Sequence, residues 1–422
     1  MLPDNSERTQ QELSLQIALG APLLATKGYG AAEVGQVYTR ARELCQQIGE
    51  FPHLFPTLYG LAAFSMVRGE LQIAHKLCEQ LLRLAQNTSD SSLLVMAHRG
   101  LGTTLLWLGE FVAARAHCEQ GLTVYNPQQH RSLMFRYGVD PKVNCLLYLA
   151  QTLWYLGYPT QALRRVQEVL SWVQGLAHPY SVAGALWEAS RLHQHCGDVP
   201  AMQARAEAAI ALSTEQGFTL FLAMGRIFRG WVLAEQGHLE EGVTELRQGL
   251  AAYRATEANI LLPYYLALLS EVYGKAGQLE KGLGALAEAL KIVSKTREHH
   301  QEAELYRLKG ELTLQRVNQK AKSKGQKSKM TSPQPLIPKI QGEVTREAEG
   351  YFLKAVEIAR KQQAKSLELR ATVSLTRLWQ SHGKQREAHQ MLAEVYGWFT
   401  EGFDTKDLQE AKALLEALVR DK

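Results

Sequence analysis

Residues 101–118 read LGTTLLWLGEFVAARAHC, and this stretch decides the fold. On both sides of Gly109, apolar residues recur at spacings of three and four, which is typical of amphipathic helices. A glycine between two such segments supplies the left-handed residue that ends a helix. The stretch therefore predicts two helices joined by a tight turn at Gly109.

The same arrangement repeats along the chain. Turn glycines recur every 40 residues, with one interval of 48, at Gly69, Gly109, Gly157, Gly197, Gly237 and Gly277. The long interval contains Pro127 and Pro141, which predicts an ordinary repeat with an insertion. Because a single helical hairpin cannot bury its apolar face alone, we expect the hairpins to stack on one another.

Alignment on the turn glycines reveals columns of similar residues. The position seven residues before each glycine is always small, which predicts a close crossing of two helices: Ala62, Gly102, Ala150, Ser190, Gly230 and Ser270. The position nine residues after each glycine is occupied by Cys78, Cys118, Val166, Ala206, Leu246 and Leu286. The column predicts that the two cysteines are packing residues rather than nucleophiles.

The leucine–glycine pair in the first helix, the glycine at the turn and the alanine in the second helix resemble the tetratricopeptide repeat. The period of 40 exceeds the usual 34, so we expect longer helices. The predicted fold is an all-α, right-handed superhelical solenoid of about nine hairpins with a C-terminal capping helix, 406–420. The predicted parts are a repeat array over 1–316, a basic disordered insertion within a hairpin over 317–342, and the last repeats with the capping helix over 343–422.

The composition is that of a globular protein. The chain has 422 residues, of which 46% are hydrophobic and 21% are charged. No apolar run approaches the roughly 20 residues that cross a bilayer, so we expect no membrane association. The five cysteines are scattered and form no CxxC pair, which argues against disulfides and a zinc ribbon. They favour a reducing compartment, and we expect a cytoplasmic protein.

The net charge of +5 is concentrated in one segment. Seven cations and no acidic residue lie between Arg316 and Lys339, so the rest of the chain is slightly acidic. We expect a helix over 302–315, a disordered, solvated segment, and a partner helix over 343–363. The alternative is a tether for nucleic acid or acidic lipid, although the segment lacks the interleaved aromatic residues that stack on bases.

Motifs for catalysis or cofactor binding are absent from the sequence. It contains no GxxxxGK[ST], GxSxG or HExxH pattern, and we expect no catalytic residue, cofactor or metal site. His193, His195 and Cys196 resemble a metal cluster, but three residues so close on one helix cannot all face one ion. We expect them to be structural. The His299–His300 pair precedes a helix and is expected to lie in a solvated loop.

One functional signal comes from variation between repeats. Positions two, six and nine before the turn glycine share one face of the first helix, and this stripe changes character while the packing columns do not. In tetratricopeptide-like arrays the first helix lines the concave groove, so we expect an exposed groove for an extended peptide or a partner helix. The alternative is a variable surface without a function. The stripe comprises Tyr148, Gln151, Tyr155, Glu188, Arg191, His195, Phe228, Trp231, Glu235, Glu271 and Lys275.

Five stretches, residues 21–29, 129–138, 263–269, 302–312 and 395–405, resemble the C-terminal helical-repeat region of a family of bacterial multidomain signalling proteins. In that family a class III adenylate/guanylate cyclase domain and an AAA-like ATPase domain precede the repeats. The metal-binding aspartates and the Walker lysine of those domains have no counterpart here. Met1 lies about where the family's repeats begin, so we expect a truncated or split product or a stand-alone repeat protein.

The resemblance and the repeats together predict a non-catalytic scaffold for protein–protein interaction. Its expected role is the regulatory, partner-binding part of a cyclase–ATPase signalling system, with a cyclase or ATPase module as a possible partner. The alternative is a nucleic-acid-associated transcriptional regulator that uses the basic segment 316–339. The chain lacks a recognisable helix-turn-helix reader, which disfavours nucleic acid as a partner.

Overall fold

The computed structural model describes residues 5–48, 53–327 and 336–420, and all regular structure within these ranges is helical. Eighteen of the helices pair into nine antiparallel hairpins: α1 (Asn5–Lys27) with α2 (Ala32–Ile48), α3 (Leu54–Val67) with α4 (Leu71–Thr88), α5 (Ser91–Leu108) with α6 (Phe111–Val124), α9 (Pro141–Tyr155) with α10 (Pro159–Gln174), α11 (Pro179–Cys196) with α12 (Val199–Gln216), α13 (Thr219–Glu235) with α14 (Leu239–Ala255), α15 (Leu262–Lys275) with α16 (Leu279–Thr296), α17 (Glu302–Lys327) with α18 (Leu336–Lys361), and α19 (Lys365–Ser381) with α20 (Gln385–Tyr396).

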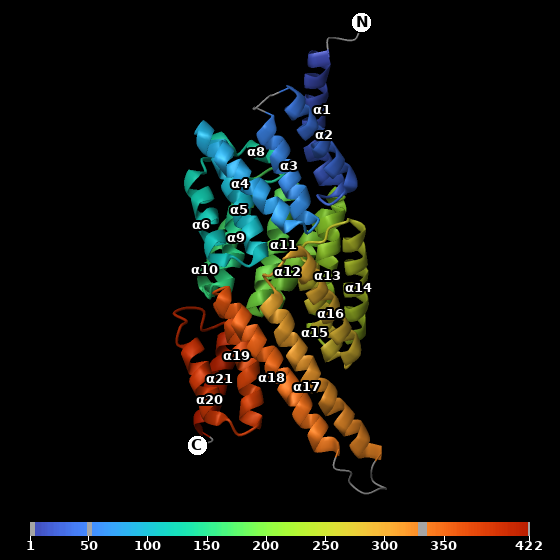
Figure 1. Ribbon diagram of the computed structural model, residues 1–422, viewed down its shortest axis with the longest axis vertical. Coiled ribbons are helices and arrows are strands. Elements are labelled where there is room, and N and C mark those ends of the chain that lie inside the picture. Colours follow the sequence, from blue (N-terminus) through green and yellow to red (C-terminus); the bar gives the residue numbers. More distant parts are fainter. Residues whose placement is uncertain (1–4, 49–52, 328–335, 421–422) are drawn as a thin grey trace.

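The hairpins stack into a right-handed superhelical solenoid (Figure 1). The insertion in the long interval forms two short helices, α7 (Pro127–His130) and α8 (Leu133–Tyr137). The helix α21 (Lys406–Arg420) covers the last hairpin and packs its apolar side on α19 and α20. The predicted all-α solenoid of nine hairpins with a capping helix is therefore confirmed.

The turns between paired helices have the predicted backbone. All six turn glycines have positive φ, between 69° and 93°. At Gly109, the amide of Gly109 donates to the carbonyl of Leu106 at 3.0 Å, and that of Glu110 donates to Leu105 at 2.9 Å. These bonds satisfy the carbonyls that a helix end leaves free. The small column is buried throughout, as is the column that contains Cys78 and Cys118.

The helices next to the basic segment extend beyond their expected bounds. Helix α17 continues past Arg316 to Lys327, and α18 begins at Leu336 rather than at 343, so the two form a long hairpin that projects beyond its neighbours (Figure 1). Lysine, alanine and glutamine favour helices, which accounts for the extension of α17. Residues 328–335 lie outside the described part of the chain, and the division at 317 and 342 stays a prediction.

The solenoid turns back on itself, so that segments far apart in the sequence meet in its interior. The amide of Asn259, between α14 and α15, donates to the carbonyl of Val67 at 2.8 Å. The amide of His300, between α16 and α17, donates to Trp107 at 3.3 Å, and the hydroxyl of Ser366 donates to the carbonyl of Trp154 at 2.5 Å. Later parts of the chain therefore fill much of the concave side of earlier hairpins.

This closure corrects one expectation. His300 does not lie in a solvated loop but is fully buried, with its ring 4.9 Å from that of Trp107. Burial and the neighbouring Arg191 hold the pKa of His300 well below its usual range, so the ring is neutral at pH 7. The physical reason is that the connection between α16 and α17 enters the interior of the superhelix. No helix in the described ranges combines the length and apolar character needed to cross a membrane.

A close helix crossing at Gly230 generates the first prediction. A Cβ atom at Gly230 in α13 would lie 2.6 Å from the backbone nitrogen of Leu246 in α14. We expect Gly230→Ala to lower the free energy of unfolding by about 1–3 kcal/mol, because neither backbone can move without disturbing its neighbours. Urea denaturation followed by circular dichroism measures this.

Gly284→Ala is the matched control. A Cβ atom at Gly284 in α16 would meet no neighbouring atom within 4 Å, so alanine there should stabilise the helix by about 0.5–1 kcal/mol. Equal effects of the two substitutions would contradict the close crossing.

Candidate functional site

The predicted stripe lies on the inner side of the superhelix, but most of it is not an exposed groove. Tyr148, Glu235 and Glu271 are half-buried, and Lys275 is exposed. The expectation of exposure is wrong for the other seven residues, which are buried: Gln151, Tyr155, Glu188, Arg191, His195, Phe228 and Trp231. The reason is the closure described above, which covers these side chains with later segments of the chain.

A buried ion pair occupies the centre of the stripe. The Arg191 and Glu188 side chains are almost completely inaccessible, and Nη2 of Arg191 lies 2.8 Å from Oε2 of Glu188. Gln151 on α9 donates to the same oxygen at 3.0 Å, and the guanidinium lies 4.8 Å from the ring centroid of Trp107 on α5. Burial raises the pKa of the Glu188 carboxyl. These contacts join three hairpins, which gives Arg191 a structural role.

The residues around His195 form a packed aromatic cluster. The His195 ring stacks on Trp154 with centroids 4.3 Å apart, and Tyr155 accepts a hydrogen bond from Gln301 at 2.7 Å. Burial, with Arg191 and Arg370 nearby, holds the pKa of His195 well below its usual range. The neutral, packed ring fits the expected structural role. The described residues contain no group of three potential metal ligands.

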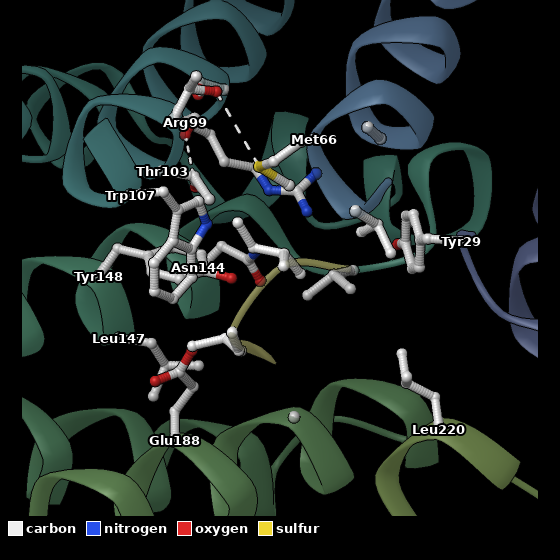
Figure 2. A pocket seen from close by; sticks show the side chains of 18 of the residues that line it. Tyr29, Met66, Arg99, Thr103, Trp107, Asn144, Leu147, Tyr148, Glu188 and Leu220 are labelled. Carbon is white, nitrogen blue, oxygen red and sulfur yellow. Dashed lines mark hydrogen bonds between the residues drawn. The ribbon is translucent and has the colours of Figure 1, made fainter. Parts of the chain in front are cut away.

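A cavity lies where the side chains on the inner face of the first helices are small. On α3 and α5 the inner positions hold Ala63, Gly100 and Thr103, whereas the same positions on α9 and α11 hold large side chains. The missing volume leaves a cavity of about 1030 Å³, including its mouth, between α3, α5, α9, α11 and α13. Figure 2 shows Arg99 and Thr103 on one side of this cavity and Glu188 and Leu220 on the other.

Arg99 is the charged residue that sequence reasoning missed. It is only 8% exposed, and it donates to the hydroxyl of Tyr59. With its amide oxygen turned toward Arg99, Asn144 accepts from Nε at 3.1 Å and from Nη2 at 2.8 Å. The sequence does contain a signal for Arg99. The position ten residues before each turn glycine holds Tyr59, Arg99, Leu147, Trp187, Ile227 and Ala267, and Arg99 is the charged member of this column.

A second cavity, which we call the charged cleft, lies at the far end of the stripe. It spans α11, α13, α15, α17, α19 and α21 and holds about 930 Å³, including open space at its mouth. Trp231 donates to Glu271 at 2.9 Å, and Lys275 pairs with Glu235. Six acidic residues outnumber four basic residues in its lining: Glu235, Glu271, Glu304, Glu311, Asp407 and Glu410 against Arg307, Arg370, Arg377 and Lys406.

Ion pairs stabilise the cleft, two of them within α17 and one between α19 and α21. Arg307 on α17 lies 2.6 Å from Glu304 and 2.5 Å from Glu311. Arg370 on α19 lies 2.7 Å from Asp407 and donates to the carbonyl of His195 on α11 at 2.6 Å. The cleft is therefore a preformed, polar and net acidic surface. It retains Trp231, Glu235 and Glu271 of the predicted stripe.

Comparison with known proteins places the fold among helical-repeat proteins. The crystal structure of a Rap protein complexed with competence and sporulation factor has a TM-score of 0.54, with 11% identity over 82% of this chain and 99% of that one. In fold, this chain is a tetratricopeptide-like helical-repeat protein. The apo quorum sensor NprR from B. thuringiensis covers 93% of this chain and 99% of its own, at a TM-score of 0.49 and 11% identity.

Sequence comparison finds no matching family model. The uncharacterized protein R02095 of Rhizobium meliloti (strain 1021) is 21% identical over 293 residues, which cover 69% of this chain. The chain matches only 28% of the length of that relative.

The buried ion pair gives the second prediction. We expect Arg191→Met to lower the free energy of unfolding by about 3–5 kcal/mol, because Glu188 then stays buried without its cation. The double variant Arg191→Met with Glu188→Leu should recover most of the loss, since no buried charge remains. Urea denaturation of each variant measures both effects.

The exposed pair of Arg115 and Glu119, 2.8 Å apart on α6, offers a control. Arg115→Met should change the free energy of unfolding by no more than about 1 kcal/mol. If Arg191→Met changed the free energy of unfolding by as little as Arg115→Met, the central stripe would be solvent-exposed rather than buried.

The third prediction concerns pH. Glu298 is fully buried, and its Oε1 accepts from the amide of Leu261 at 2.8 Å. Burial raises its pKa well above the usual range, so the folded chain holds this proton more tightly than the unfolded chain. The resulting stabilisation is complete below about pH 4.3 and is lost as the pH rises toward the raised pKa.

Glu298→Gln removes this titration. The difference in free energy of unfolding, variant minus wild type, should therefore increase with pH above about 4.3. Urea denaturation at a series of pH values measures it. A difference independent of pH would show that the carboxyl titrates alike in both states.

Proposed function

We propose that this chain is a non-catalytic helical-repeat scaffold that binds a protein partner in the charged cleft and regulates a cyclase–ATPase signalling module. The observation that carries the proposal is the cleft itself. Side chains from one helix of each of five hairpins and from the capping helix converge on it. The cleft stays open, whereas the centre of the stripe is buried. Repeat proteins typically bind their partners on surfaces that several neighbouring repeats build together, and the cleft is such a surface.

The chemistry of the cleft favours a segment of protein with a net positive charge. Its lining is polar, its acidic residues exceed its basic residues, and Trp231 supplies an aromatic surface at its wall. Charged groups at a rim steer a complementary partner and fix its register. The same acidic surface repels a phosphate backbone, which weighs against the nucleic-acid alternative. No comparison supports that alternative.

The regulatory role rests on the family resemblance. The stretches 21–29, 129–138, 263–269, 302–312 and 395–405 resemble the repeat region of cyclase–ATPase proteins. The match to 28% of a longer relative is compatible with one module among several. A cyclase or ATPase module, in the same chain or a separate one, is therefore the partner we propose.

The fourth prediction tests the cleft. Glu311 and Glu410 have partly exposed side chains, at 32% and 37%, and lie at its lining. We expect Glu311→Gln with Glu410→Gln to reduce partner recovery about tenfold, because each lost rim charge removes roughly 0.5–1 kcal/mol of attraction. The measurement is affinity capture from the source cells, with the bound proteins identified and quantified by mass spectrometry.

The matched control is Glu280→Gln with Glu288→Gln on α16, where both side chains are exposed and lie outside the cleft. It should leave recovery unchanged. Recovery of a protein with a cyclase or ATPase domain, lost only in the cleft variant, supports the proposal. Equal recovery by the two double variants would place the partner elsewhere, and absence of any such protein would contradict the signalling role.

A further inference from the structure

The cavity beside α5 contains a buried cation without a counterion. The hydrogen-bond partners of Arg99 within the described ranges, Tyr29, Tyr59 and Asn144, are all neutral. Arg99 is also the one lysine or arginine among the described residues that line this cavity. A buried guanidinium is costly unless a negative charge balances it. In contrast, the buried Arg191 has Glu188 as its partner.

Two tyrosine hydroxyls near Arg99 lack an acceptor for their protons. Tyr29 and Tyr180 are 9% and 7% exposed, and their ring centroids are 6.3 Å apart. Neither hydroxyl proton has an acceptor among the described residues, although both side chains line the cavity. A buried hydroxyl without an acceptor is unfavourable. Burial raises the pKa of both hydroxyls. The charge of Arg99 opposes this rise, and at Tyr29 a hydrogen bond from Arg99 opposes it too.

The remaining walls are largely apolar, and the carboxylate of Glu188 among the described lining residues is paired with Arg191. Met66, Leu147 and Leu220 face the space in Figure 2, and Trp107, Phe221 and Met224 also line it. Ligand pockets combine apolar walls with a few convergent polar groups. Arg99 and the hydroxyls of Tyr29 and Tyr180 are the convergent polar groups of this cavity.

We propose that this cavity binds a small organic carboxylate with an apolar or aromatic body. The carboxylate accepts from the free guanidinium N–H groups of Arg99 and from the hydroxyls of Tyr29 and Tyr180. The body lies against Met66, Leu147 and the neighbouring apolar side chains. This ligand balances the buried charge and satisfies both hydroxyls at once, whereas a water molecule satisfies a hydroxyl but carries no charge.

Other anions fit less well. A phosphate ester carries up to two negative charges, and the cavity offers one cation. A guanidinium and a carboxylate match in charge and in planar geometry. The inference does not depend on the charged cleft, since the two cavities share no lining residue.

The fifth prediction uses 4-phenylbutanoate as the probe and 4-phenylbutanol as its neutral counterpart. Isothermal titration calorimetry on the full chain should show at least tenfold tighter binding of the carboxylate, as expected for a hydrogen-bonded charge pair. Fluorescence provides a second readout, because Trp107 and Trp187 line the cavity. Arg99→Met should abolish the preference for the carboxylate while binding of the alcohol persists.

Three further variants keep the result decisive. Tyr180→Phe, which retains the ring, should weaken carboxylate binding roughly tenfold and leave alcohol binding unchanged. Ala63→Phe fills the cavity and should abolish binding of both probes. Arg115→Met, on the outer helix α6, is the matched arginine control and should bind both probes as the wild type does.

Several outcomes would overturn the proposal. Equal affinity for acid and alcohol, or a preference for the acid that survives in Tyr180→Phe and Arg99→Met, would remove the anion site. Undiminished binding by Ala63→Phe would place the probe outside the cavity. Tighter binding of inorganic phosphate than of the carboxylate would assign another anion. None of these results alters partner capture through the charged cleft, so failure of one proposal is distinguishable from failure of the other.

Discussion

The contact of the connection between α16 and α17 with the inner faces of α5 and α9 determines how the rest of the molecule is organised. There the backbone of His300 reaches Trp107, and the side chain of Gln301 reaches Tyr155. Each contact joins residues that many hairpins separate, so the interior of the superhelix is part of the hydrophobic core. Inward-facing polar side chains must then find partners inside the protein, as Arg191 finds Glu188.

The interior stripe differs from one end of the solenoid to the other. Where its residues are large, on α9 and α11, they pack directly on later segments of the chain. Small residues on α3 and α5, such as Ala63 and Gly100, leave the cavity beside Arg99. From Trp231 onward, charged residues meet the ion pairs of α17, α19 and α21 and form the charged cleft. A repeated backbone thus presents two cavities of opposite character through side-chain size and charge alone.

The hairpins could be predicted because their determinants are local. Gly109 and its counterparts end a helix, and the small column that includes Gly230 sets the distance to the next helix within the same hairpin. Burial of Arg191 could not be predicted in this way, since it depends on the pitch of the superhelix, which sums small rotations over many repeats. The hydrogen bond between Ser366 and Trp154 spans 212 residues, and no periodicity of 40 encodes it. Arg99 was visible in sequence as a lone charge in its column, but only the structure shows that its partners are neutral.

The hydrogen bond of Ser366 to Trp154 also bears on how the molecule responds to force. An open solenoid stretches like an elastic element, because each repeat touches only its neighbours and yields a little. Here α19 rests directly on the end of α9, so a displacement of one reaches the other without passing through the four hairpins that separate them in sequence. The superhelix is consequently cross-linked by noncovalent contacts in its interior. A force on the C-terminal helices would have to break these contacts before the solenoid could lengthen.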